Sequence, residues 1–172
     1  VAAELRDFLW GDGLKATMKT WRGFWRMSKH SRGVALEAAA ALAATCVGLR
    51  LVGFRRWKAT LIRLAPQPAP VYVPQDQARI ATAREIARIL ESASRHLIFH
   101  ASCLEQSLVL WWLLARRGIP ADLRIGARKE AGRFEAHAWV ELGSVVLNDS
   151  GEAHLHFAPF DGSIVSMETQ PH

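Results

Sequence analysis

The sequence SCLEQSLVLWWLLARRGIPADLRIGARK, residues 102–129, is the most informative about the fold, because it predicts one helix followed closely by one strand. Ser102 and Glu105 can form a capping box, in which each side chain accepts a hydrogen bond from the other residue's backbone. Cys103 is then the first helical residue, and a glycine and a proline end the helix. Apolar and polar residues alternate over 121–128, which is typical of a half-buried strand.

The two segments that follow predict an antiparallel meander. Alternation over 134–142 places His137 and Trp139 on the face opposite to Ala138. A third strand is expected over 145–149, after a short turn. We therefore expect the α+β class, with a helix packed on an antiparallel sheet.

Cys103 is the candidate nucleophile. Free backbone amides and the helix dipole at a helix N-terminus stabilise a thiolate, and the same amides can hold an oxyanion. The competing interpretation is a small buried apolar residue, which is the usual role of an isolated cysteine. Cys46, the other cysteine, lies inside an apolar run and is expected to serve packing.

His137 and Asp149 are the candidate base and the candidate carboxylate that orients it. In a hairpin, the turn decides which residues face each other. A turn centred on Gly143 pairs His137 with Asp149 on one face, whereas a two-residue turn at Gly143 and Ser144 puts them on opposite faces. The pairing therefore predicts an odd-length turn or a bulge. Taken singly, His137 could be a satisfied histidine and Asp149 a turn residue.

The chain before residue 76 is expected to be mostly helical. Apolar residues recur at helical spacing over 14–25, and a nearly continuous apolar run covers 34–52. The second run contains Glu37 and Arg50, so a buried core helix is favoured over a membrane span.

Four prolines between residues 66 and 74 predict an extended linker. We therefore expect a helical N-terminal region at 1–65, a linker at 66–75 and a catalytic domain at 76–172. The last of these opens with an amphipathic helix over 77–97.

Charge and cysteine content narrow the functional classes. The net charge of +6 favours anionic partners such as lipid headgroups or acidic peptides, or reflects a solvated basic surface. Nucleic acid is not favoured, because the basic, aromatic segment 21–32 has no named nucleic-acid motif; this segment fits a protein or membrane-surface contact or ordinary packing. Two distant cysteines without a signal peptide predict no disulfide and a cytoplasmic location.

No metal or other cofactor is expected. His154 and His156 would share one face of a strand, but Cys103 is the only thiolate near them in sequence, and no paired zinc-site spacing occurs. The sequence also has no phosphate-binding glycine loop.

Three stretches resemble the leader peptidases of lasso peptide biosynthesis, whose core is a transglutaminase-like, papain-like cysteine enzyme. They are CLEQSLVLWWLLARRGIPADLRIGARK at 103–129, FEAHAWVEL at 134–142 and VVLNDS at 145–150. The resemblance implies that Cys103 is the nucleophile, His137 the general base and later acid, and Asp149 the orienting carboxylate. It also implies removal of the leader from a ribosomally made precursor peptide through a thioester.

The same resemblance implies partners. Residues 1–30 are too short and too rich in tryptophan for the winged-helix leader-recognition domain found in this family, so the sequence looks like the stand-alone form that needs a separate recognition protein. The macrolactam-forming cyclase and a membrane surface are further candidate contacts.

Two rival functions stay open at this point. The same three residues could transfer an acyl group to an amine, as transglutaminases and arylamine acetyltransferases do. A non-catalytic peptide- or membrane-binding module on the same scaffold is the other alternative. The second oxyanion donor is also open, with His100, Gln106 and Trp139 as candidates beside the Cys103 amide.

Overall fold

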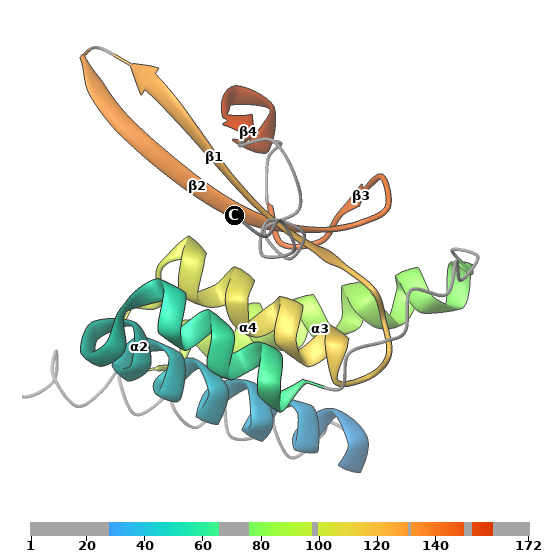
Figure 1. Ribbon diagram of the computed structural model, residues 1–172. Helices are drawn as coiled ribbons and strands as arrows, with labels where there is room; N and C mark the ends of the chain where they lie inside the picture. The colour runs from blue at the N-terminus through green and yellow to red at the C-terminus, as the bar shows by residue number, and fades with distance from the viewer. Residues whose placement is uncertain (1–27, 66–75, 98–99, 131, 150–152, 160–172) are drawn as a thin grey trace, which may run out of the picture. The chain divides into compact units, whose positions relative to one another are not determined.

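The computed structural model describes residues 28–65, 76–97, 100–130, 132–149 and 153–159. The chain divides between Leu36 and Glu37 into two units, and the elements that build the site all lie in the second. This unit combines helices with one antiparallel sheet (Figure 1), which confirms the expected α+β class.

Helix α2 (Lys29–Leu64) consists of two helical stretches joined at Gly53, where a positive φ of 78° interrupts the helix. The second stretch folds back on the first. Its Trp57 ring leaves no room for a side chain at Gly48, and the indole Nε1 donates to Thr45 Oγ1 at 3.2 Å. The glycine therefore permits the tight contact that holds this helical hairpin together.

The first stretch of α2 confirms the helix expected within 34–52, but only one face of it is a core face. Ala38, Leu42 and Cys46 are buried, whereas Val47 and Leu51 are exposed. Helix α2 is long and apolar enough to cross a membrane by length and composition alone, a test that core helices and signal sequences also pass. The cytoplasmic location stays a prediction.

Some expectations fall outside the described residues. These are the helix over 14–25, most of the basic, aromatic segment at 21–32, and the linker at 66–75. The proposed domain boundaries therefore stay predictions as well.

Helix α3 (Gln77–Arg95) starts after Asp76, whose side chain accepts from the Ala78 amide at 3.2 Å. Its apolar residues are buried on one face, as the pattern over 77–97 predicted. Helix α4 (Cys103–Ala115) begins at the predicted residue and packs against α3 and the sheet. The run from Ser107 to Ala115 is buried throughout, so α4 is the central element of the core.

The sheet has the order β3-β2-β1-β4, with antiparallel neighbours. Its strands are β1 (Asp122–Glu130), β2 (Arg133–Leu142), β3 (Val145–Val146) and β4 (Ala158–Pro159). A short 3₁₀ helix, η1 (Ala153–His156), precedes β4. Figure 1 shows α3 and α4 on one side of the long β1–β2 hairpin and β4 beside β1, where it forms the edge of the sheet.

The turn between β2 and β3 differs from the expected one. Leu142 pairs with Val145 and Glu141 with Val146, so the turn consists of two residues, Gly143 and Ser144. Gly143 has a φ of 60°, which such a tight turn favours. The odd-length turn was therefore wrong, and the third strand has two residues rather than five.

Candidate active site

The start of α4 has the predicted capping box. Ser102 Oγ accepts from the Glu105 amide at 3.3 Å, and Glu105 Oε2 accepts from the Ser102 amide at 2.6 Å. Both bonds fix the backbone on either side of Cys103, which is partly exposed. The thiol thus stands at a rigid helix start with a path to solvent.

The two cysteines have different environments. Cys46 is buried, and its thiol is hydrogen-bonded to Glu105. Burial and, second, this bond to an acidic group raise the pKa of Cys46 to about 11. Cys46 is therefore protonated at neutral pH, which agrees with the packing role predicted for it.

The short β3 leaves part of the edge of β2 without a strand partner, and side chains take over there. The last backbone bond runs from the Leu147 amide to the Val140 carbonyl at 3.0 Å. Asn148 then turns its side chain into the ladder, where its Oδ1 accepts from the Val140 amide at 2.8 Å. Its Nδ2 donates to Ser107 Oγ, which itself donates to the Ala138 carbonyl at 2.9 Å. One asparagine thus joins α4 to the strand edge.

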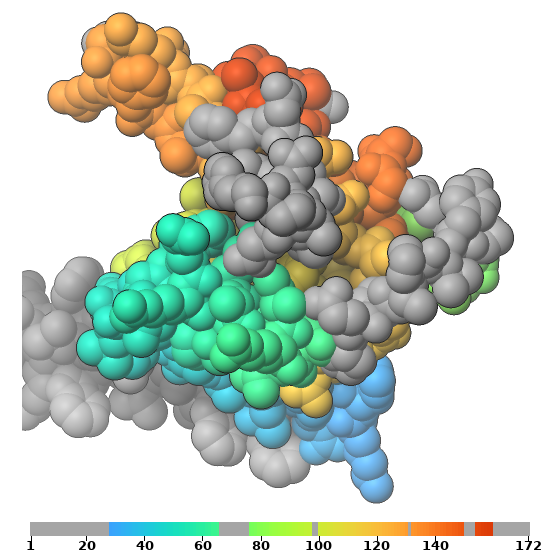
Figure 2. All heavy atoms as spheres, viewed as in Figure 1, coloured from blue at the N-terminus to red at the C-terminus, as the bar shows by residue number. Residues whose placement is uncertain are grey.

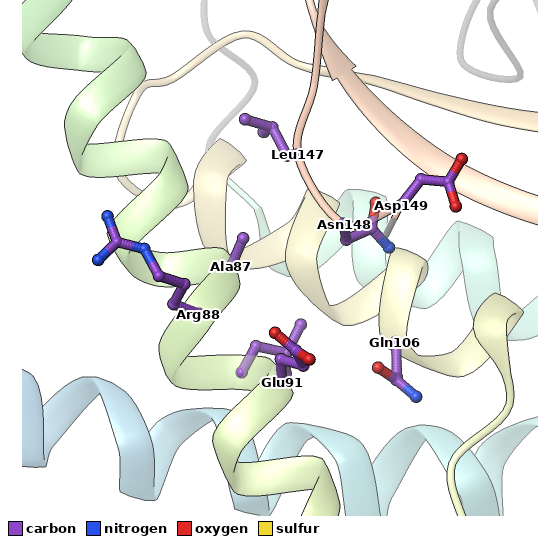
Figure 3. A pocket seen from close by; sticks show the side chains of 8 residues that line it. Ala87, Arg88, Glu91, Gln106, Leu147, Asn148 and Asp149 are labelled. Carbon is purple, nitrogen blue, oxygen red and sulfur yellow. The ribbon is translucent and has the colours of Figure 1, made fainter. Parts of the chain in front are cut away.

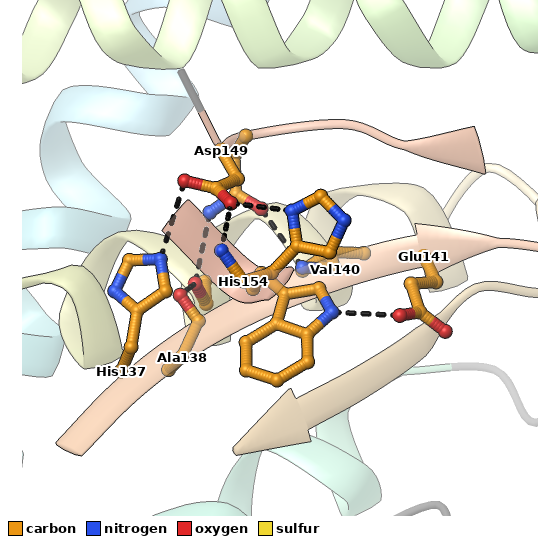
Figure 4. A network of polar contacts seen from close by, with 9 residues as sticks. His137, Ala138, Val140, Glu141, Asp149 and His154 are labelled. Atoms are coloured by element: carbon orange, nitrogen blue, oxygen red, sulfur yellow. Dashed lines mark hydrogen bonds and ion pairs between the residues drawn. The ribbon is translucent and has the colours of Figure 1, made fainter. Parts of the chain in front are cut away.

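This departure from the ladder brings Asp149 to His137. Oδ1 of Asp149 lies 3.4 Å from His137 Nε2, and only 3% of the Asp149 side chain is exposed. The separation is longer than a usual N–H···O bond of about 2.7 to 3.2 Å. The pairing that an odd-length turn was expected to produce therefore arises from a bend after Leu147 (Figure 4).

A second histidine, His154, also contacts this carboxylate. Asp149 Oδ2 accepts from both the backbone amide and the ring Nδ1 of His154, each at 2.6 Å. Burial raises the pKa of the Asp149 carboxyl, but these two bonds and the charges of both histidines outweigh burial and lower it below its usual range. Asp149 is therefore ionised at neutral pH.

The strand expected at His154 and His156 is wrong. Both residues lie in η1, where residues two apart do not share a face. Sequence reasoning considered His154 only as a metal ligand and missed its bond to Asp149. The one available signal was its position five residues after the candidate carboxylate.

Aromatic rings enclose His137. Its ring stacks on Trp139 at 5.9 Å between centroids and lies 5.2 Å from the Phe157 ring. Phe157 can come this close because Gly126, which pairs with His137 across the sheet, has no side chain. A Cβ there would be 2.9 Å from Phe157 Cβ. These contacts restrict the imidazole and shield it from water.

A model of the transglutaminase-like superfamily matches residues 43–160, which is more than half of the sequence. The chain belongs to the transglutaminase-like superfamily. It is also 43% identical over 53 residues to the microcin J25-processing protein McjB of Escherichia coli. That match covers 31% of this chain and only 24% of McjB. No solved structure matches the chain.

The transglutaminase-like chain has a cavity of about 220 Å³ beside Asp149 (Figure 3). Ala87, Arg88, Leu90 and Glu91 of α3 form one side of it. Gln106 of α4 and residues 147–149 form the other. Apolar carbon and charged groups both face this space, so it suits one amphipathic side chain rather than a long ligand.

The structure also bears on the second oxyanion donor. The side chain of Trp139 has one N–H group, and this group already donates to Glu141 Oε1 at 2.7 Å. Gln106 Nε2 donates to the Ala101 carbonyl at 2.8 Å and retains a second hydrogen. Of these two candidates, Gln106 is the one with a donor left.

Proposed function

We propose that the chain is a cysteine peptidase that removes the leader from a lasso precursor peptide, with Cys103 as nucleophile, His137 as base and Asp149 as orienting carboxylate. The observation that carries the proposal is the buried carboxylate of Asp149 next to His137 Nε2. Because Nε2 faces the carboxylate, Nδ1 is the nitrogen left to accept a proton from a thiol.

The position of α4 supports Cys103 as that thiol. Cys103 and Ser107 are four residues apart and share a helix face, and Ser107 contacts the Ala138 carbonyl. The far end of α4 leads into Asp122, which pairs with Glu141. One helical turn toward the start of α4, about 5.4 Å, runs back along β2 from Ala138 by between one and two residues of about 3.3 Å each, which places Cys103 near the level of His137 and Ala136.

The proposed reaction is acyl transfer to water. His137 takes the Cys103 proton, and the thiolate attacks the carbonyl carbon of the scissile peptide bond. His137 then returns the proton to the leaving amine of the core peptide, and the leader stays behind as a thioester. Water, deprotonated by His137, releases the leader as a free acid.

The choice of substrate rests on the comparisons. McjB is named as a processing protein for microcin J25, and the family match is transglutaminase-like, so a processing role for this chain is the simplest extension. The proposed partners are the precursor, a separate winged-helix recognition protein and the macrolactam-forming cyclase.

Mass analysis of products tests the proposal. The chain is incubated with its candidate precursor, with and without a recognition protein, in parallel with Cys103→Ala and His137→Ala. We expect a free leader acid from the wild type, none from Cys103→Ala and at least a hundredfold slower release from His137→Ala. An amide product instead of an acid would indicate transfer to an amine.

Thiol alkylation provides a test that needs no substrate. Iodoacetamide at pH 7.4 should modify Cys103 and leave Cys46 unmodified, because Cys46 is buried and its pKa is about 11. Peptide mapping assigns the label. Slow modification of Cys103, together with no cleavage under any condition, would favour a non-catalytic binding module.

A further inference from the structure

The carboxylate of Asp149 is shared between two histidines on opposite sides of it. Oδ1 faces His137 Nε2 at 3.4 Å, while Oδ2 receives two donors from His154 at 2.6 Å (Figure 4). The tighter contacts are thus made by the residue that the proposed mechanism does not use. This asymmetry indicates which group fixes the position of the carboxylate.

The contact with His154 requires a hydrogen on its Nδ1. An ionised carboxylate can only accept hydrogen bonds, and Asp149 is ionised at neutral pH because its pKa is lowered. A ring nitrogen 2.6 Å from Oδ2 must therefore be the donor. Together with the backbone amide of the same residue, it holds Oδ2 from two directions.

The ring of His154 is itself fixed by packing. Its centroid lies 6.0 Å from that of Trp139, which also stacks on His137. Only 21% of the His154 side chain is exposed. Trp139 thus contacts both imidazoles, and the two histidines, the tryptophan and the carboxylate form one packed cluster.

We propose that His154 is a positioning residue, which holds Asp149 so that the other carboxylate oxygen faces His137 Nε2 and fixes the orientation of that imidazole, leaving Nδ1 of His137 for the proposed nucleophile. The inference rests on the proposed function and adds a fourth residue to it. Without the Nδ1 donor of His154, the Asp149 carboxylate can rotate into the space left by the His154 ring. Its Oδ1 then no longer holds the His137 ring in one orientation. Misplacement of a catalytic group by about 1 Å can reduce turnover about a hundredfold.

Three substitutions at His154 separate positioning from packing. His154→Ala removes the ring donor, His154→Asn places an amide donor near the position of Nδ1, and His154→Gln moves the donor farther out. All three keep the backbone bond to Asp149. His156→Ala is the matched control, because His156 lies in the same 3₁₀ helix and is exposed.

The readouts are steady-state cleavage of the precursor and the rate of Cys103 alkylation between pH 5 and 9. We expect His154→Ala and His154→Gln to lower kcat at least tenfold with little change in KM, and to move the alkylation profile to higher pH. His154→Asn should recover most of both, and His156→Ala should match the wild type. If His154→Ala does not fold, as judged by circular dichroism, the Asn and Gln variants carry the comparison.

The outcomes distinguish the two proposals. Fast Cys103 alkylation and cleavage in the wild type, unchanged in His154→Ala and His154→Gln, would overturn the positioning role and leave the proposed function intact. Equal loss of activity in His154→Asn and His154→Gln, with an unmoved alkylation profile, would also overturn it. A wild type that neither cleaves precursor nor alkylates quickly at Cys103 would remove both proposals.

Discussion

Three groups surround the Asp149 carboxylate: two hydrogen-bond donors, both from His154, and the imidazole of His137. The His154 amide, the His154 ring and the His137 ring leave almost no surface of the carboxylate to water. A buried carboxylate with this many partners is stable only while it is ionised. The contribution of Asp149 to stability should therefore depend on pH.

Asp149→Asn tests this link. The pKa of Asp149 is lower in the folded chain than the value of about 3.9 expected when unfolded. Its stabilising contribution is therefore fully present above about pH 4 and is lost as pH falls through the lower folded value. We expect the difference in unfolding free energy between wild type and Asp149→Asn to shrink from pH 6 to pH 3, by urea denaturation.

The same variant should cleave precursor about 10²- to 10⁴-fold more slowly at neutral pH, because the imidazole loses its orienting charge. Asp122→Asn, the same change at the start of β1, is the matched control and should leave cleavage unaltered. A pH-independent stability difference for Asp149→Asn would contradict the ionised state of Asp149.

Features of single residues that depend only on their near neighbours in sequence could be predicted. Ser102 and Glu105 identify a helix start from residue types and spacing alone, and the structure has that cap. The role of His154 could not be predicted in the same way. It depends on a bend after Leu147 and on a 3₁₀ helix, and neither has a periodic pattern that sequence reasoning could detect.

At the scale of elements, the length of β3 determines the site. A regular strand over 145–149 would pair every backbone group with β2 and, in the observed register, would turn Asp149 to the face away from His137. The strand stops after Val146, and Asn148 satisfies the Val140 amide with its side chain instead. The sequence argument expected an odd-length turn or a bulge to bring Asp149 to His137, whereas the turn has two residues and the approach occurs where the strand ends.

Gly126 of β1 pairs with His137 of β2, and its lack of a side chain lets Phe157 approach the site. A Cβ at this residue would meet Phe157 Cβ at 2.9 Å, the Ala158 carbonyl at 3.0 Å and Trp139 Cη2 at 3.0 Å. We expect Gly126→Ala to push β4 and Phe157 away from His137, lowering both the thermal midpoint and kcat. Overpacking of this kind costs about 1 to 3 kcal/mol.

Gly33→Ala is the matched control for this change. Within the described residues, a Cβ at Gly33 would have no atom within 4 Å, and alanine favours helix over glycine by roughly 1 kcal/mol. The control should therefore unfold at an equal or higher temperature with unchanged kcat. A Gly126→Ala variant that behaves like this control would show that the approach of β4 does not matter to the site.

At the scale of the whole second unit, helix α2 is tied to α4 by polar contacts. Glu37 accepts from Nη2 of Arg117, two residues beyond the end of α4, at 2.6 Å, and the Cys46 thiol is hydrogen-bonded to Glu105 of the capping box. The N-terminal helical region predicted for 1–65 thus contributes, through α2, to the support of the helix that carries Cys103. No periodicity in the sequence could predict these ties, because they join residues far apart in the chain.

The size of the site bears on how a precursor is recognised. The cavity beside Asp149 has a volume of about 220 Å³, which is enough for about one side chain. Stable recognition of a peptide or protein partner normally buries about 800 Å² on each side. The proposed winged-helix recognition protein would supply this larger contact with the leader, which leaves the chemistry to the present chain.

This separation predicts a specific kinetic effect of the recognition protein. By holding the leader close to the peptidase, it raises the effective concentration of the scissile bond without touching Cys103. Adding it should lower the KM for precursor at least tenfold, while kcat and the rate of Cys103 alkylation stay the same. A short peptide that spans only the cleavage site should be cleaved at one rate with or without it. An increase in alkylation rate on adding the protein would mean instead that it completes the active site.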